Sequence, residues 1–136
     1  MSQEFRPNRD EIVALIKLAE ENLRLAKLEF RENFIRGAIT KAYYVFLDTA
    51  RAALLSKGLI TRTHGSSLAK FGEEFVKSGI VAKEHGRWFN RALRARQEAD
   101  YEALKVFDVK EAEEIIAQAE KFFNELKPLI VIPDQS

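Results

Sequence analysis

The stretch Arg94–Glu102, with the sequence RARQEADYE, concentrates side chains that could do chemistry. Its arginines could bind a phosphate or a carboxylate through paired N–H donors. Asp100 and Tyr101 could transfer a proton to or from a bound substrate. Arg96, Asp100 and Tyr101 are therefore candidate catalytic residues, and what they can do depends on which way Arg96 points.

Helical periodicity over about residues 81–99 places Arg96 on the apolar side of a helix. At 100° per residue, Arg96 shares an arc with Trp88, Phe89 and Ala92, whereas Arg94 lies on the opposite, solvated face. A buried arginine requires a carboxylate or phosphate partner. Two interpretations follow. Arg96 forms an intramolecular clamp with Asp100 or Asp48, or it faces a ligand phosphate or a partner's acid in a pocket.

Three further residues are candidates. His64 lies in the segment TRTHGSS, which we expect to be a polar loop, with Ser66 or Ser67 capping the next helix. An imidazole on a loop beside hydroxyl groups is a candidate general base. His85, on the apolar stripe, fits a hydrogen-bonded core residue better than a ligand. Tyr44 is predicted on a polar helix face, where it would anchor a subunit interface or stack on a base.

Charge is unevenly distributed although the net charge is only +1. Residues 83–96 carry five bases against one acid, and residues 108–125 carry six acids against two lysines. Such a basic helix could face phosphate groups of RNA or a partner. The residues that would make this contact are Arg87, Arg91 and Arg94. Alternatively, the basic and acidic helices pair with one another and complement their helix dipoles.

The elements that position these residues are all predicted to be helices, because apolar residues recur at helical spacing and no hairpin signal occurs. The first begins at an Asn8 cap, and a break follows around residues 30–33. A long second helix ends at Gly58, and a short third ends at Gly79. The fourth carries Arg96, and the fifth runs from a reciprocal cap at Asp108 to Pro128. The apolar tail, 129–133, should dock in an extended form on the core or on a neighbouring subunit.

Together these helices predict one all-α domain over residues 1–136, an up-and-down bundle of about five helices. No apolar run approaches the length of about eighteen residues needed to span a membrane, and the N-terminus lacks a signal-peptide core. We therefore expect a cytoplasmic protein. Cysteine is absent and only two histidines occur, so no metal site and no cofactor are expected.

Several motifs in order resemble the HEPN superfamily, in particular its small stand-alone prokaryotic proteins. They span about residues 23–123 and read AITKAYY, ARAALLSKGL, THG, FGEEFVKSG and RARQEADYE. The resemblance implies a bundle of four to five helices and a homodimer. It also implies a metal-independent ribonuclease site in the dimer cleft. A minimal nucleotidyltransferase, paired with the protein as toxin and antitoxin, is the implied partner.

The chain departs from the family's nuclease motif, which is an arginine followed after four to six residues by a histidine. Arg96 matches the arginine, but no histidine follows His85. The first hypothesis is therefore a protein that binds RNA, a nucleotide or a nucleotidyltransferase without efficient cleavage. The second is a divergent ribonuclease that uses Arg96 for phosphate and His64, Asp100 or Tyr101 for proton transfer. The third is a structural helical interaction protein.

Overall fold

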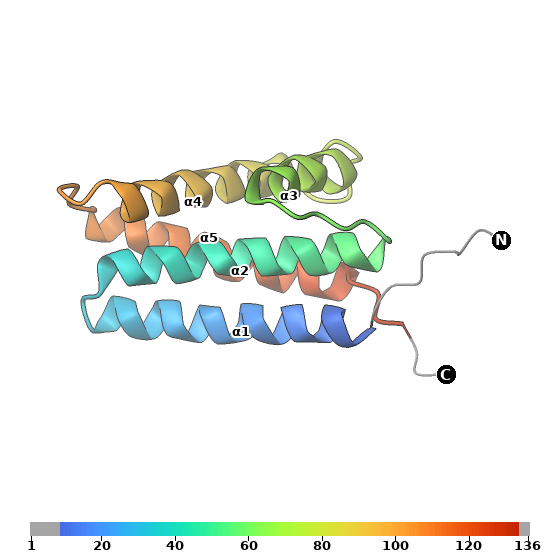
Figure 1. Cartoon of the computed structure of the whole chain (residues 1–136), viewed down its shortest axis with the longest axis horizontal. Helices are drawn as coiled ribbons and strands as arrows, with labels where there is room; N and C mark the ends of the chain where they lie inside the picture. The colour runs from blue at the N-terminus through green and yellow to red at the C-terminus, as the bar shows by residue number, and fades with distance from the viewer. Residues whose placement is uncertain (1–8, 134–136) are drawn as a thin grey trace.

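A computed structural model of the chain describes residues 9–133 and shows an all-α bundle (Figure 1). Two long helices, α1 (Arg9–Arg31) and α2 (Ile35–Ser56), run antiparallel. A shorter α3 (His64–Phe71) continues into a π-helical turn, η1 (Gly72–Val76). Then come α4 (Lys83–Tyr101), α5 (Val109–Leu126) and a 3-10 turn, η2 (Lys127–Leu129). The predicted bundle of about five helices is confirmed.

The break between α1 and α2 has no glycine or proline, and Asn33 makes it possible. Asn33 adopts φ of 65°, a left-handed conformation that asparagine tolerates better than most residues. The Phe34 N–H then donates to the Glu29 carbonyl at 2.7 Å and closes the turn. The predicted break at residues 30–33 is confirmed, whereas the Asn8 cap lies outside the described residues.

Helix α2 lies in the middle of the bundle, packed between α1 and α4 with α5 across it (Figure 1). Its many small buried residues, such as Ala38, Ala42 and Ala53, allow the neighbouring helices to approach closely. Phe46 of α2 contacts Phe122 of α5 at a ring-centroid distance of 4.8 Å and stacks on Phe89 of α4 at 5.9 Å. This aromatic core fixes α4, and therefore Arg96, relative to α2.

The remaining helix ends lie close to the positions predicted from the sequence, with differences in their hydrogen bonds. Gly58 and Gly79 both have φ of 83°, as the helix ends predicted at these glycines require. The Asp108 cap forms, but its carboxylate accepts from the Lys110 N–H at 2.9 Å in place of the reciprocal bond predicted with Glu111. In the apolar tail Ile130 is buried, whereas Val131 is 69% exposed, so Ile130 is the tail's anchor on the core.

Within residues 9–133, no helix combines the length and apolar character that crossing a membrane requires.

Candidate functional site

Arg96 lies where α4 faces the middle of α2, and its guanidinium covers two tyrosine rings. Its central carbon is 5.7 Å from the Tyr43 ring centroid and 5.9 Å from that of Tyr44, within the range of cation–π attraction. Nε lies 2.9 Å from Asp100 Oδ2, one turn along α4. This Nε–H is buried and not aligned with the carboxylate for a hydrogen bond. The contact is thus an ion pair by distance, and the Asp100 clamp is the arrangement found.

The side chain of Arg96 is 21% exposed, so the guanidinium is only partly enclosed. Within residues 9–133, its terminal nitrogens donate no hydrogen bond to a protein acceptor. Asp48, the other partner considered, instead accepts a hydrogen bond from Asn22 Nδ2 at 3.1 Å. The guanidinium of Arg96 is therefore held by the two tyrosine rings and the Asp100 carboxylate. Its terminal N–H groups remain free to donate hydrogen bonds to a ligand.

His64 joins the same ring cluster. Its imidazole centroid is 5.4 Å from that of Tyr43 and 6.3 Å from that of Tyr44. The predicted loop position is wrong, because His64 is the first residue of α3. The predicted cap is wrong too. Thr63 caps α3 by accepting from the Ser66 N–H at 3.0 Å, while the Ser66 hydroxyl accepts from the Thr63 N–H. This capping box aims His64 at α2.

The electrostatics of the cluster are those of an anion site. Burial lowers the pKa of His64, and the positive charges of Arg96 and Arg51 lower it further. His64 is therefore a neutral imidazole at pH 7 and able to accept a proton. Burial raises the pKa of the Tyr43 hydroxyl well above its ordinary value, so that group remains protonated. Its oxygen is buried and has no hydrogen-bond partner within the described residues.

Asp48 lies on the far side of Tyr43 and Tyr44 and carries an unusual carboxyl group. Burial raises its pKa to about 6, although the Asn22 hydrogen bond and the charge of Arg51 both act to lower it. Helical periodicity places Arg51 on the same face of α2 as Tyr44 and Asp48, whereas the sequence pattern gave no sign of Asn22 as a member of this cluster. They come from the polar edges of α1 and α2, and packing brings them together.

Tyr44 was predicted to be exposed on a polar helix face, and this is wrong. It is half-buried, and its ring contacts Tyr43 at 5.4 Å and the His64 imidazole. The polar face of α2 is not open, because Asp48 is also buried there against α1. Tyr44 thus lines the Arg96 cluster, and its predicted role at a subunit interface stays a prediction.

The other predicted residues lie outside this cluster. Tyr101 is 80% exposed at the end of α4. Arg87 and Arg94 are exposed on the outer face of α4. Arg91 pairs with Glu114 of α5 at 3.0 Å, which is the pairing of basic and acidic helices that the charge pattern offered as an alternative. The structure therefore joins Arg96, His64, Tyr44 and Asp100 and leaves the outer arginines on a separate face.

His85 is a core residue, as its place on the apolar stripe predicts. It is 2% exposed, its ring packs edge-on against Trp88 and Phe122, and Nε2 forms an ion-pair contact with Glu125 of α5. The Glu125 side chain is partly exposed and contacts the buried imidazole from the solvent side. His85 therefore links α4 to α5 and does not reach the Arg96 cluster.

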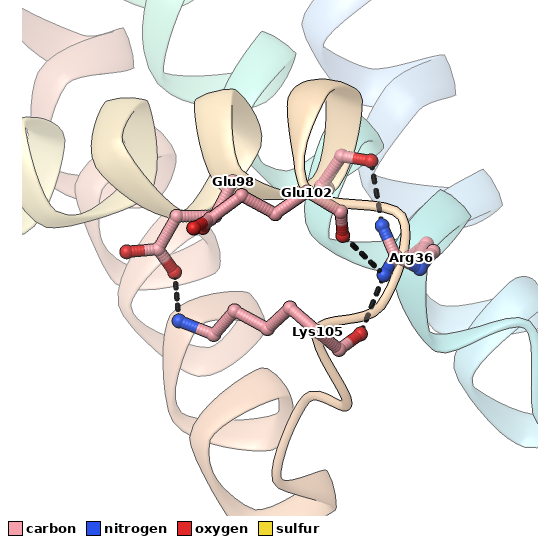
Figure 2. Close-up of polar contacts among 5 residues, drawn as sticks. Arg36, Glu98, Glu102 and Lys105 are labelled. Carbon is pink, nitrogen blue, oxygen red and sulfur yellow. Dashed lines mark hydrogen bonds and ion pairs between the residues drawn. The ribbon is translucent and has the colours of Figure 1, made fainter.

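Arg36 holds the segment that follows Arg96 (Figure 2). From the start of α2 its guanidinium donates to the carbonyls of Ala99 at 2.7 Å, Glu102 at 2.8 Å and Ala103 at 3.1 Å, and also to that of Lys105. The end of α4 leaves carbonyls without helical partners, and Arg36 supplies the donors they lack. Asp100, within this segment, is thereby held in place beside Arg96.

The cluster fits an anion rather than a metal ion. No group of three or more potential metal-ligating side chains comes together in residues 9–133. The cluster instead offers a partly exposed guanidinium, a second arginine charge nearby, a neutral imidazole and tyrosine rings. A phosphate ester fits such a set, because guanidinium donors match its oxygens and the half-buried Tyr44 ring can contact an attached base, whereas Tyr43 is fully buried.

Comparisons with known proteins show the family to which the chain belongs. The model of the HEPN domain matches residues 12–129. A protein of Methanocaldococcus jannaschii named "Putative toxin MJ0605" is 40% identical over 119 residues, covering 88% of each chain. A Thermotoga maritima protein named "UPF0332 protein" is 37% identical and covers 82% of this chain and 85% of its own. A second M. jannaschii protein, "Putative toxin MJ0142", is 29% identical over 121 residues.

Proposed function

Because the chain belongs to the HEPN family, we propose that it binds RNA through a phosphate at the Arg96 cluster and acts in a toxin-like context. The observation that carries the proposal is the state of Arg96. Its guanidinium is fixed over Tyr43 and Tyr44, and its outer donors have no protein acceptor within the described residues. Two relatives named as toxins support the context.

The same cluster explains why we propose binding without efficient cleavage. The positions where the family motif would place its histidine after Arg96 hold Tyr101, Glu102 and Ala103, and the carboxylate of the neighbouring Asp100 already faces Arg96. A carboxylate beside a scissile phosphate repels it, and an ionised aspartate is a weak base toward a ribose hydroxyl. RNA bound by Arg96 therefore meets an anion, not an imidazolium, on the α4 side.

A metal-independent ribonuclease is a second candidate, and the position of His64 favours it. The fold brings this imidazole to the tyrosines that carry Arg96, and its lowered pKa keeps it neutral at pH 7. In this mechanism His64 would take the proton of a ribose 2′-hydroxyl, whose oxygen then attacks the phosphorus that Arg96 binds. Water would give a proton to the leaving 5′-oxygen, and the protonated His64 would give its proton to the hydroxide that remains, because the Asp100 carboxylate is paired with Arg96.

A nucleotidyltransferase partner and a homodimer are part of the same proposal, since the family resemblance implies both. Tyr44, which was predicted at the subunit interface, is half-buried and contacts Tyr43 and His64 within the chain. The exposed arginines Arg87 and Arg94 are available to a protein or RNA partner on the outer face of α4.

The binding proposal is tested by fluorescence anisotropy with a labelled single-stranded RNA. Arg96→Gln should weaken binding about tenfold or more, because it removes a fixed phosphate contact. Arg94→Gln is the matched control, since it removes the same charge from an exposed position two residues away. It should weaken binding about twofold at most and leave the salt dependence little changed.

Measuring the stability of both variants shows whether a loss of RNA affinity comes from unfolding or from loss of the phosphate contact. Arg96→Gln should lower the free energy of unfolding by about 1 kcal/mol, because both members of its ion pair are partly exposed. Arg94→Gln should change it by less than about 0.5 kcal/mol. Equal losses of RNA affinity in the two variants would show that the cluster is not the binding site.

The two candidate functions are separated by incubating the protein with RNA in the presence of a chelator. We expect the RNA to remain intact while it is bound. Robust cleavage by the wild-type protein, abolished by His64→Ala but not by His85→Ala, would establish the ribonuclease in place of the binding protein. His85 suits the control because it lies apart from the cluster.

A further inference from the structure

A groove opens on the outside of the bundle where the second half of α1 lies against the first half of α5. The two helices run antiparallel and contact each other (Figure 1). The groove has a volume of about 540 Å³ and is lined by side chains from residues 24–31 of α1 and 113–116 of α5. We call it the α1–α5 groove. None of its lining residues belongs to the Arg96 cluster.

The floor of the α1–α5 groove is apolar and accessible. Leu28 is 44% exposed, Phe30 is half-buried, and Ile116 of α5 supplies a third apolar side chain. Leu28 also lines a recess at the end of α1 together with Phe34, so the apolar surface continues along α1 beyond the groove. Single exposed leucines are ordinary, whereas an apolar floor in a recess between two helices can bury a partner's side chains from several sides.

The two walls of the groove differ in charge. The α1 wall carries the bases Arg24, Lys27 and Arg31, whereas the α5 wall contributes the acid Glu113. Lys27 forms an ion pair with Glu120 of α5. Arg24 and Arg31 are exposed and form no ion pair within residues 9–133, and the same holds for Glu113. Two unpaired guanidinium groups therefore lie along one side of the apolar floor.

This arrangement fits an amphipathic helix that carries acids beside its apolar stripe. A helix can lie between two others with its apolar side chains on the floor of the groove that they form. Arg24 and Arg31 are seven residues apart, which is two turns or about 10 Å along α1. Acids seven residues apart on a second helix have the same spacing and lie on one edge of its apolar stripe. They can therefore pair with both arginines at once.

RNA and an anionic membrane fit the groove less well. RNA binds through its phosphates, and such contacts would leave the apolar floor uncovered. A membrane surface would also meet α5, where residues 113–120 hold three acids and no base. These carboxylates would repel anionic lipid headgroups. A narrow helix can instead place its acids against α1 alone.

We propose that the α1–α5 groove binds an acidic amphipathic helix of a partner protein. The apolar stripe of the partner covers Leu28 and Phe30, and its acids pair with Arg24 and Arg31. This binding is separate from the proposed RNA binding, because it uses neither Arg96 nor the outer arginines of α4. Failure of either proposal would leave the other unaffected.

Fluorescence anisotropy with two labelled peptides tests the proposal. The acidic peptide is a helix of about twenty residues, with leucines along one stripe and glutamates seven residues apart beside it. The second peptide has glutamine in place of each glutamate. The wild-type protein should bind the acidic peptide about tenfold more tightly, because only that peptide offers carboxylates to Arg24 and Arg31.

Variants of the protein show whether the groove is responsible. Arg24→Gln/Arg31→Gln should bind both peptides with equal affinity, and Leu28→Ser should bind both several-fold more weakly than the wild type. Lys77→Gln/Lys83→Gln is the matched control, since it removes two exposed positive charges from positions outside the groove. This control should keep the full preference for the acidic peptide. Circular dichroism checks that each variant retains its helices.

Equal binding of the two peptides by the wild-type protein would overturn the proposal, as would a preference that survives in Arg24→Gln/Arg31→Gln. Two further measurements would then identify another occupant. Binding to phosphatidylglycerol vesicles that is lost in the same double variant would assign the groove to a membrane. Self-association that is lost in Leu28→Ser, measured by sedimentation, would assign it to a second copy of the chain.

Discussion

Arg96 stands at the boundary between the core and the solvent, and that position gives it two roles at once. Its inner edge rests on Tyr43 and Tyr44 and lies beside Asp100, while its outer nitrogens remain available. In a completely buried arginine, the guanidinium N–H groups would all donate hydrogen bonds to acceptors of the protein. One left fully exposed would have no fixed orientation. The partial enclosure explains why we assign phosphate binding to Arg96 and not to Arg94.

Asp48 allows the electrostatics of the cluster to be tested through stability. Its folded-state pKa, about 6, lies above the ordinary value of 3.8. The folded protein therefore holds this proton more tightly than the unfolded chain. The stability that Asp48 contributes is full below about pH 4 and is lost as the pH rises through about 6. Asp48→Asn, which mimics the protonated form, should be more stable than the wild type at pH 8 by about 1 to 2 kcal/mol.

The measurement for Asp48 is urea denaturation of both proteins at pH 4.5 and pH 8. The difference between them should shrink toward zero at the lower pH, because both then carry a neutral group at position 48. Asn22 can still donate to the amide oxygen of the variant, so the hydrogen bond is not lost. A difference that is the same at both pH values would show that Asp48 does not titrate in this window.

At the scale of the elements, the short helix α3 decides whether His64 can take part in chemistry. The capping box formed by Thr63 and Ser66 puts the helix cap at Thr63, three residues before Ser66, the first of the two predicted caps, and so places His64 on a rigid element. A histidine on a helix facing α2 keeps a constant distance from the tyrosines, which a loop residue would not. The position at which α3 begins therefore determines where His64 lies in the site.

Thr63→Ala should lower the free energy of unfolding by about 1 kcal/mol, because the Ser66 N–H loses its acceptor. Thr63→Ser keeps a hydroxyl in the same place and should retain most of that stability. Urea denaturation at neutral pH measures both. If Thr63→Ser were as destabilised as Thr63→Ala, the methyl group and not the cap would be responsible.

At the scale of the whole molecule, one continuous core connects all five helices through α2. Phe46, Phe71, Phe89 and Phe122 bring α2, α3, α4 and α5 into mutual ring contact, and α1 packs along the other side of α2. A chain with one core should unfold in a single cooperative transition. A single transition is also what the prediction of one domain over residues 1–136 requires.

Trp88 provides the measurement, since it is the single tryptophan of the chain and lies on α4 against His85. Its fluorescence reports the α4–α5 contact, whereas circular dichroism at 222 nm reports all the helices. The two denaturation curves should share one midpoint at a given protein concentration. A fluorescence transition that clearly precedes the loss of helix would show that α4 unfolds as a separate unit.

The helices, and Asp100 as one of the possible partners of Arg96, can be predicted from the sequence, because both depend on local spacing. Apolar periodicity and the glycines at 58 and 79 mark helix extents, and Asp100 lies one turn from Arg96 on any helix. The HEPN resemblance also rests on local motifs, and the family match confirms it.

Which residues from different helices meet could not be predicted from the sequence and is set by how the helices pack. Packing buries Asp48 and half-buries Tyr44, which the pattern of α2 alone placed in solvent, because α1 and α3 pack against that face. It also brings His64 to Arg96 and carries Arg36 to the end of α4. The physical reason is that periodicity defines the faces of one helix, whereas the burial of a polar face depends on what packs against it.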